Sequence, residues 1–178
     1  DVAGVGGDGD AIFFTIHVIV MGLLQALEPL VAETVARLWS EGLGDDGSID
    51  WVAAMSNRLP MTLVSRLIGL PAVDMEWLVT GAYATAQMLD GAITPDQLQK
   101  AIAAATELAG YLADQFSQAR KHPGDNLLGD LARHCNAGEL RAETAVIMLI
   151  QLVSAGGEST AGLLGSSALM LAGRSDIA

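Results

Sequence analysis

Apolar residues are most concentrated between Ala142 and Leu171, where the chain reads AETAVIMLIQLVSAGGESTAGLLGSSALML. This pattern predicts one helix over 141–172, which would be ~45 Å long at ~1.5 Å per residue. Apolar residues lie around most of its circumference, so we expect this helix to be central and buried, and not merely to lie on a surface.

Polar and small residues interrupt this run near its middle. Gly156 and Gly157 each weaken a helix by ~1 kcal/mol relative to alanine, and the hydroxyls of Ser159 and Thr160 can bond back to carbonyls one turn earlier. Glu158 stands between these pairs, and a carboxylate in apolar surroundings is costly unless it is hydrogen-bonded or functional. We therefore expect a bent helix with a carboxylate at its centre.

Helical spacing of apolar residues continues through the rest of the chain, without any long segment of strand period. Pro29 and Pro60 should interrupt two of the helices, and Asp50 and Thr94-Pro95 should begin two others. The predicted fold is a single all-α domain over 1–178, with a flexible glycine-rich stretch at 1–10 and about eight helices around the central one. Helices are predicted over 11–26, 29–41, 51–69 with a kink at Pro60, 72–89, 95–121, 126–134 and 141–172.

Composition and charge narrow the function classes. The formal net charge is -12, which argues against nucleic acid as a partner, because binding phosphate needs clustered Lys and Arg. A single cysteine permits no intrachain disulfide, so we expect a cytoplasmic protein. The apolar run 11–24 is shorter than a membrane span of ~20 residues. It is therefore read as a core or interface helix, with membrane association as the less favoured alternative.

The sequence gives little support for a metal site or a dinucleotide-binding site. Gly4, Gly6 and Gly9 formally spell G-x-G-x-x-G, but too few residues precede them for the strand that such a site requires. A metal site needs several converging ligands, and no such spacing exists among the candidate side chains His17, His122, His134 and Cys135. We expect no metal site.

Three segments resemble one known family in order and spacing. They are AGGEST (155–160) in the central helix, LPMTLVSRLIGLPAVDMEWL (59–78), and HPGDNLLGDLARHCNAGELRAETAVIMLIQLVSAGGEST (122–160). Together they resemble the heme-thiolate monooxygenases, the cytochromes P-450, over most of residues 48–172. The resemblance implies the first part of that fold, up to and including its long central helix.

The resemblance also implies a functional site on the central helix. Gly156 and Gly157 would leave room for dioxygen over a heme, and Glu158 and Ser159 would match the acid and alcohol that relay protons to it. Serine replaces the more usual threonine there. The predicted site residues are catalytic Glu158 and Ser159, and ligand-binding Val153, Gly156, Gly157 and Thr160.

The chain departs from the family in the parts that hold heme. The family's cysteine ligand stands in a glycine-rich loop far beyond the central helix, and no such loop occurs before Ala178. Cys135 does not match that motif. The helix that should supply cations to the heme propionates falls near 11–24, which contains no Lys or Arg. We therefore expect no cofactor in this chain, with heme expected only if a C-terminal cysteine loop exists.

Three functions remain open from the sequence. The first is a heme-free protein that binds an apolar small molecule of natural-product type and promotes a non-oxidative step such as cyclisation, with Glu158 as acid or base. The second is a fragment of a heme-dependent monooxygenase. The third is a non-catalytic helper of a biosynthetic enzyme. All three predict a homodimer through exposed apolar surface.

Overall fold

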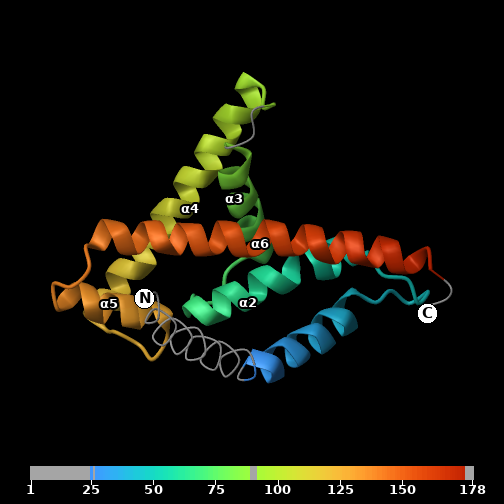
Figure 1. Cartoon of the computed structure of the whole chain (residues 1–178), viewed down its shortest axis with the longest axis horizontal. Helices are drawn as coiled ribbons and strands as arrows, with labels where there is room; N and C mark the ends of the chain where they lie inside the picture. The colour runs from blue at the N-terminus through green and yellow to red at the C-terminus, as the bar shows by residue number, and fades with distance from the viewer. Residues whose placement is uncertain (1–24, 26, 89–91, 175–178) are drawn as a thin grey trace, which may run out of the picture.

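A computed structural model describes residues 25, 27–88 and 92–174, and within them the fold is all-α (Figure 1). Residues 27–42 form the first described helix. An isolated antiparallel bridge joins Leu43 to Ile49 in the loop that follows. The later elements are the π-helix η1 (Val52–Ser56) and the α-helices α2 (Arg58–Ile68), α3 (Met75–Gln87), α4 (Pro95–Lys121), α5 (Leu127–Asn136) and α6 (Ala142–Ala172).

The prediction of about eight helices is wrong for the described residues, where six helical elements follow the first described helix. Pro29 does not begin that helix, because residues 27 and 28 are already helical. Pro60, where a kink was predicted within 51–69, lies in the first turn of α2, directly after η1. The helix predicted over 11–26, with His17, lies outside the described residues except for Gln25.

The interruption near Pro60 takes the form of η1. Proline has no N–H to donate and its ring crowds the carbonyl one turn earlier, here that of Ser56. The backbone widens instead, and the Asn57 N–H donates to the Val52 carbonyl at 3.1 Å. Upstream, Asp50 Oδ1 accepts from the Ala53 N–H at 3.0 Å, which confirms Asp50 as the predicted cap.

Side-chain caps fix the starts of three later helices. Asp74 accepts from two backbone N–H groups of α3, and Asn126 accepts from Gly129 at the start of α5. Thr94 and Gln97 form a reciprocal capping box before Pro95, which confirms the predicted start of α4. Local sequence therefore determines where these helices begin.

The long helix α6 packs against α2, α3 and α4 through a stripe of residues spaced by four. The buried members of the stripe are Ala145, Leu149, Val153, Gly157 and Ala161. Gly156 and Gly157 bring α6 close to α2. A Cβ added at Gly156 would lie 2.6 Å from Val64 Cγ2, and one added at Gly157 would lie 2.5 Å from Met61 Cε. The helix stays α-helical through both glycines.

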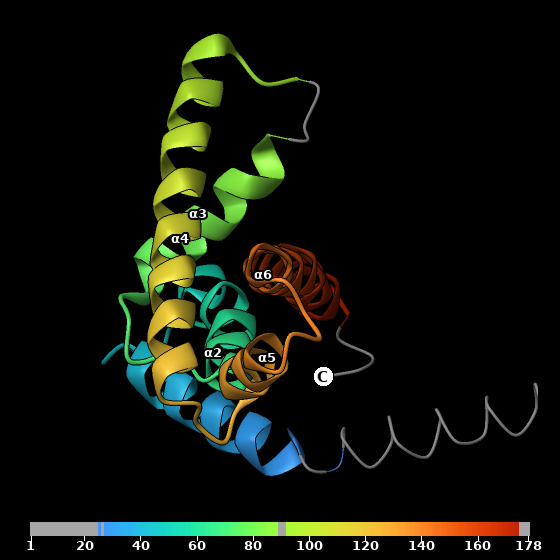
Figure 2. The same cartoon turned by 90° about the vertical axis from the view of Figure 1, so that its left-hand side faces the viewer.

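The opposite side of α6 is exposed, so the predicted burial of this helix holds for one side only. Figure 2, which looks nearly along α6, shows α2, α3 and α4 gathered on one side of it. Exposed fractions reach 66% at Leu163, 77% at Leu169 and 72% at Met170. Among the described helices, α6 alone is long and apolar enough to cross a membrane by length and composition, a weak indication that core helices of soluble proteins also give.

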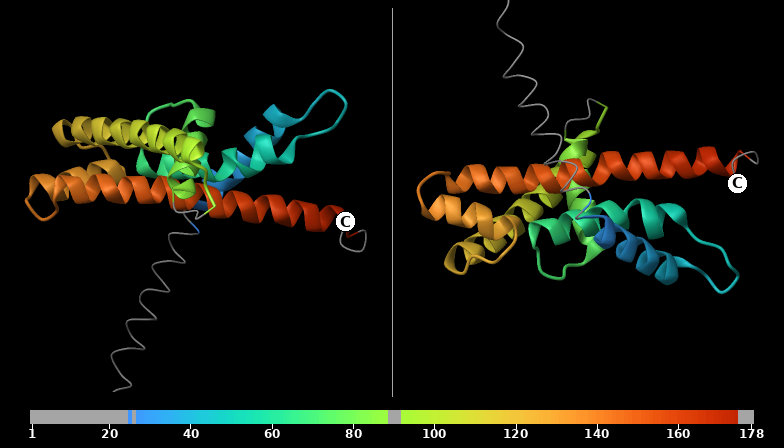
Figure 3. Two further views of the ribbon diagram at one scale, coloured as in Figure 1. Left: turned by 90° about the horizontal axis from the view of Figure 1, so that it is seen from above. Right: turned by 60° about the horizontal axis from the view of Figure 1, so that its bottom comes forward.

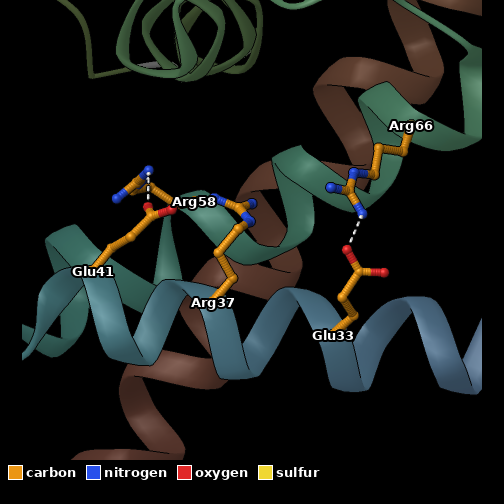
Figure 4. Close-up of polar contacts among 5 residues, drawn as sticks. All are labelled: Glu33, Arg37, Glu41, Arg58 and Arg66. Carbon is orange, nitrogen blue, oxygen red and sulfur yellow. Dashed lines mark hydrogen bonds and ion pairs between the residues drawn. The ribbon is translucent and has the colours of Figure 1, made fainter.

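Ion pairs fasten the first described helix to α2, on the side of α2 away from α6 (Figures 3 and 4). Glu41 contacts Arg37 at 2.8 Å and Arg58 at 2.9 Å, and Glu33 lies 3.6 Å from Arg66. Later residues of the first helix pair with earlier residues of α2, so the two helices run antiparallel. The hydrogen bond from Arg37, with that from Arg58, holds the pKa of Glu41 below its ordinary value of 4.5.

We predict that Glu41→Gln destabilises the fold at neutral pH by roughly 0.2–1 kcal/mol, the usual size for exposed ion pairs. Because the folded-state pKa of Glu41 is lowered, its contribution is present above the ordinary value and lost as pH falls through the folded value. Urea unfolding at neutral and acidic pH measures this. The matched variant Glu107→Gln, at an exposed position of α4, should change stability little, and an acid-independent loss in Glu41→Gln would contradict the prediction.

The glycine contact yields a second prediction. Gly156→Ala should destabilise the fold, because crowding against the stiff Val64 side chain costs about 1–3 kcal/mol, against a helix-propensity gain of about 1 kcal/mol. Gly157→Ala should cost less, since Met61 Cε can move. Gly162→Ala is the control within α6, because its Cβ meets no atom within 4 Å, and it should stabilise. Denaturant midpoints give the order, and equal effects at all three positions would refute it.

Candidate functional site

Two cavities lie along one flank of α6 and meet at Glu158. The first, here called the α3-side cavity, has a volume of about 410 Å³ and lies between α3 and the first half of α6. The second, the η1-side cavity, has a volume of about 460 Å³ and lies between η1, α3 and the second half of α6. The α6 residues that line them recur every three or four positions, so both cavities open on the same flank.

The cavities differ in their lining. The α3-side cavity is lined by Thr85, Ala86, Ile150, Gln151, Ser154, Ala155 and Glu158. The η1-side cavity is lined by Val52, Ser56, Asn57, Tyr83, Glu158, Ala161, Gly162, Gly165, Ser166 and Leu169. The segments predicted as helices over 72–89 and 95–121 contribute differently to the cavities. The first of these segments lines both cavities through α3, whereas α4 lines a separate cavity with α6 around Phe116 and Arg120.

Glu158 is exposed at the junction of the cavities, whereas the sequence predicted a carboxylate buried within the helix. Among the described residues it forms no ion pair. Its charge reaches Tyr83, whose pKa is raised above 10.0 chiefly by burial and further by the Glu158 carboxylate. Glu158 can therefore accept hydrogen bonds or protons from either cavity.

Four polar side chains on the cavities that Glu158 joins could not be found from the sequence, namely Ser56, Asn57, Tyr83 and Ser154. The Tyr83 hydroxyl donates to Asn57 Oδ1 at 2.9 Å. Ser56 is 1% exposed, and its Oγ has no hydrogen-bond partner in the part of the chain that the structure describes. In the α3-side cavity, Ser154 Oγ is likewise buried without a partner. No local motif marks these residues, because the packing of η1 and α3 on α6 brings them together.

The other predicted site residues lie away from the cavities. Ser159 is exposed and its hydroxyl donates to the Ala155 carbonyl at 3.0 Å, and Thr160 is exposed. Val153 is fully buried in the core. Gly156 and Gly157 contact α2, so helix packing accounts for both glycines. The structure places Glu158 alone of the six on these cavities, and the roles of the others stay predictions.

The candidate metal-ligand side chains of the described residues do not converge on one site. Cys135 is buried in the core cluster on α5. His134 pairs with Glu139 at 2.6 Å on the surface. No group of three or more His, Cys, Asp or Glu that could hold a metal occurs among the described residues. The segment 11–24, where cations were expected, lies outside them.

The sequence is 48% identical over 154 residues to cytochrome P450 144 of Mycobacterium tuberculosis, which covers 86% of this chain. The chain belongs to the cytochrome P450 family. It spans 35% of the length of that relative. Vitamin D3 dihydroxylase of Streptomyces griseolus is 28% identical over 158 residues, covering 88% of this chain and 37% of that protein. No protein-family profile matches the sequence.

Solved cytochrome P450 structures share the fold. Cytochrome P450mel 107F1, which has biaryl coupling reactivity, superposes with a TM-score of 0.71 at 28% identity, over 83% of this chain and 36% of that one. P450BioI, solved with a fatty-acyl-ligated acyl carrier protein, gives 0.74 at 24% identity, over 83% and 38%. The resemblance inferred from residues 48–172 is thereby confirmed.

The pair Tyr83 and Glu158 yields a prediction. Glu158→Gln should lower the pKa of Tyr83, because the tyrosinate no longer meets a neighbouring negative charge. The pKa should stay above 10.0, since burial is its larger cause. Ultraviolet titration measures this in a chain with two tyrosines.

Tyr111 serves as the internal control, because burial alone raises its pKa, and Tyr83→Phe assigns the two transitions. An unchanged Tyr83 transition in Glu158→Gln would show that the carboxylate does not act on this hydroxyl.

Proposed function

We propose that this chain is the α6-bearing part of a cytochrome P450 monooxygenase, and that the exposed side of α6 forms one wall of the reaction site. The observation that carries the proposal is the exposed apolar surface beside Glu158 and Ser159, in a chain 48% identical to a cytochrome P450. Large exposed apolar surfaces mark places where another surface or ligand binds. Here we assign it to further polypeptide of the same enzyme, with the substrate between.

The residues of this chain would position the substrate and exclude water from it, and would not bind the cofactor. Met148, Leu152 and Leu163 follow one another along the exposed side of α6, and would supply the apolar wall. Ser159 donates its hydroxyl proton to Ala155, so its oxygen can accept a further hydrogen bond. Bound heme would supply the oxidising chemistry. Its ligand would come from outside the described residues, as the family resemblance implies.

Complementation tests the proposal. The chain is co-expressed with the part of cytochrome P450 144 that follows its matching segment, with added heme precursor. We expect a Soret band and a carbon-monoxide difference spectrum from the co-purified pair, and neither from the chain alone after incubation with hemin and removal of the unbound hemin. A Soret band from this chain alone would contradict the assignment of the iron ligand to other polypeptide.

Matched variants show which surface of the chain binds the second polypeptide. The double variant Leu152→Glu/Leu163→Glu should abolish co-purification. The variant Gln118→Glu, at an exposed position of α4, should not. Without the second polypeptide, we propose that the same surface pairs with another copy, so the chain alone should sediment as a homodimer. The double variant should sediment as a monomer, and a dimer that survives it would place the contact elsewhere.

We propose as a second candidate a heme-free protein that binds an apolar small molecule and promotes a non-oxidative step such as cyclisation. The position of Glu158 at the junction of two cavities favours it. A carboxylate there can exchange protons with a bound molecule. If the purified heme-free chain shows turnover and Glu158→Gln abolishes that turnover, the result supports this second candidate over the first. Turnover that is unchanged in Glu158→Gln would contradict the second candidate.

A further inference from the structure

The η1-side cavity is held open by defined contacts. Trp51 Nε1 donates to the Leu164 carbonyl at 3.1 Å, which fixes the start of η1 against α6. Glycines leave the facing side of α6 bare. A Cβ added at Gly162 would meet no atom within 4 Å, and one at Gly165 would come no nearer than 3.7 Å to Ser56 Oγ. A volume of about 460 Å³ lies within the usual range for small-molecule sites.

Three side chains of this cavity, those of Ser56, Tyr83 and Glu158, can each accept a hydrogen bond. The Tyr83 hydroxyl donates its proton to Asn57, so its oxygen is left to accept. The Glu158 carboxylate accepts only. Ser56 is almost fully buried, its Oγ lies near Gly165 of α6, and it has no hydrogen-bond partner among the described residues. Buried polar groups are normally paired, so an orphan hydroxyl at a cavity wall indicates a ligand atom.

Charge selects the kind of ligand. Among the described residues that line the η1-side cavity, Glu158 is the only charged one, and none is Lys, Arg or His. A cationic donor is therefore favoured and an anion disfavoured. Away from Ser56, Tyr83 and Glu158, the cavity wall includes the apolar side chains of Val52, which is 54% exposed, and Leu169, which is 77% exposed. These side chains can contact a hydrocarbon chain.

We propose that the η1-side cavity binds a primary alkylammonium ligand, with the ammonium group between Ser56, Tyr83 and Glu158 and the alkyl chain toward Val52 and Leu169. Three N–H donors of an ammonium match three acceptor oxygens. The inference does not rest on the monooxygenase proposal, because it concerns the chain alone and a flank of α6 distinct from the apolar wall.

Calorimetric titration of the purified chain with hexylammonium, hexanol and hexanoate tests the chemistry. Hexylammonium should bind about tenfold or more tighter than hexanol, because a charge-assisted hydrogen bond is stronger than a neutral one. Hexanoate should bind weakest. Glu158→Gln should remove the preference for the cation and leave hexanol binding unchanged, while Glu107→Gln should alter neither. Equal affinities for all three probes would overturn the proposal.

Further variants test the location. Gly162→Leu should fill the cavity and abolish binding of both hexylammonium and hexanol. Gly110→Leu, at a glycine of α4 whose Cβ also meets nothing within 4 Å, should bind as the original chain does. If circular dichroism shows that Gly162→Leu is unfolded, Ser56→Ala decides instead. It should weaken hexylammonium binding several-fold, and unchanged binding in that folded variant would place the ligand elsewhere.

Discussion

The close contact between α2 and α6 at Gly156 and Gly157 is the constraint on which the described fold depends. Two helices can approach this closely only where side chains are absent, and a methyl group at either position would overlap Val64 or Met61. With that contact set, the stripe from Ala145 to Ala161 faces the core. The direction of every other side chain of α6 follows from the helix period.

This arrangement gives α6 two different sides. The side toward α2 provides packing, and the flank toward α3 and η1 carries the cavities and Glu158. The glycine pair that the family motif links with oxygen binding therefore also has a packing role in this chain. A single stretch of sequence serves both purposes because residues one position apart on a helix point about 100° away from each other.

Much of the fold could be predicted from the sequence because its signals are local. The Thr94 capping box, the Asp50 cap and the apolar run of α6 each depend on neighbours within a few residues. The exposed side of α6 could not be predicted, since a helix that is apolar all round shows no polar side to face water. The cluster of Ser56, Asn57 and Tyr83 beside Glu158 was also inaccessible. It depends on contacts such as that of Trp51 with Leu164, which lie far apart in the chain.

The π-helix η1 means that the segment between Asp50 and α2 contains one residue more than a continuous α-helix would. A π turn contains one residue more than an α turn, so η1 is equivalent to an α-helix that has accepted a one-residue insertion. Removing that residue would restore a continuous α-helix between the Asp50 cap and α2. It would also turn everything before the deletion by about 100° relative to α2. Trp51 would then point away from Leu164, so the extra residue sets the rotational phase that joins the start of this helix to α6.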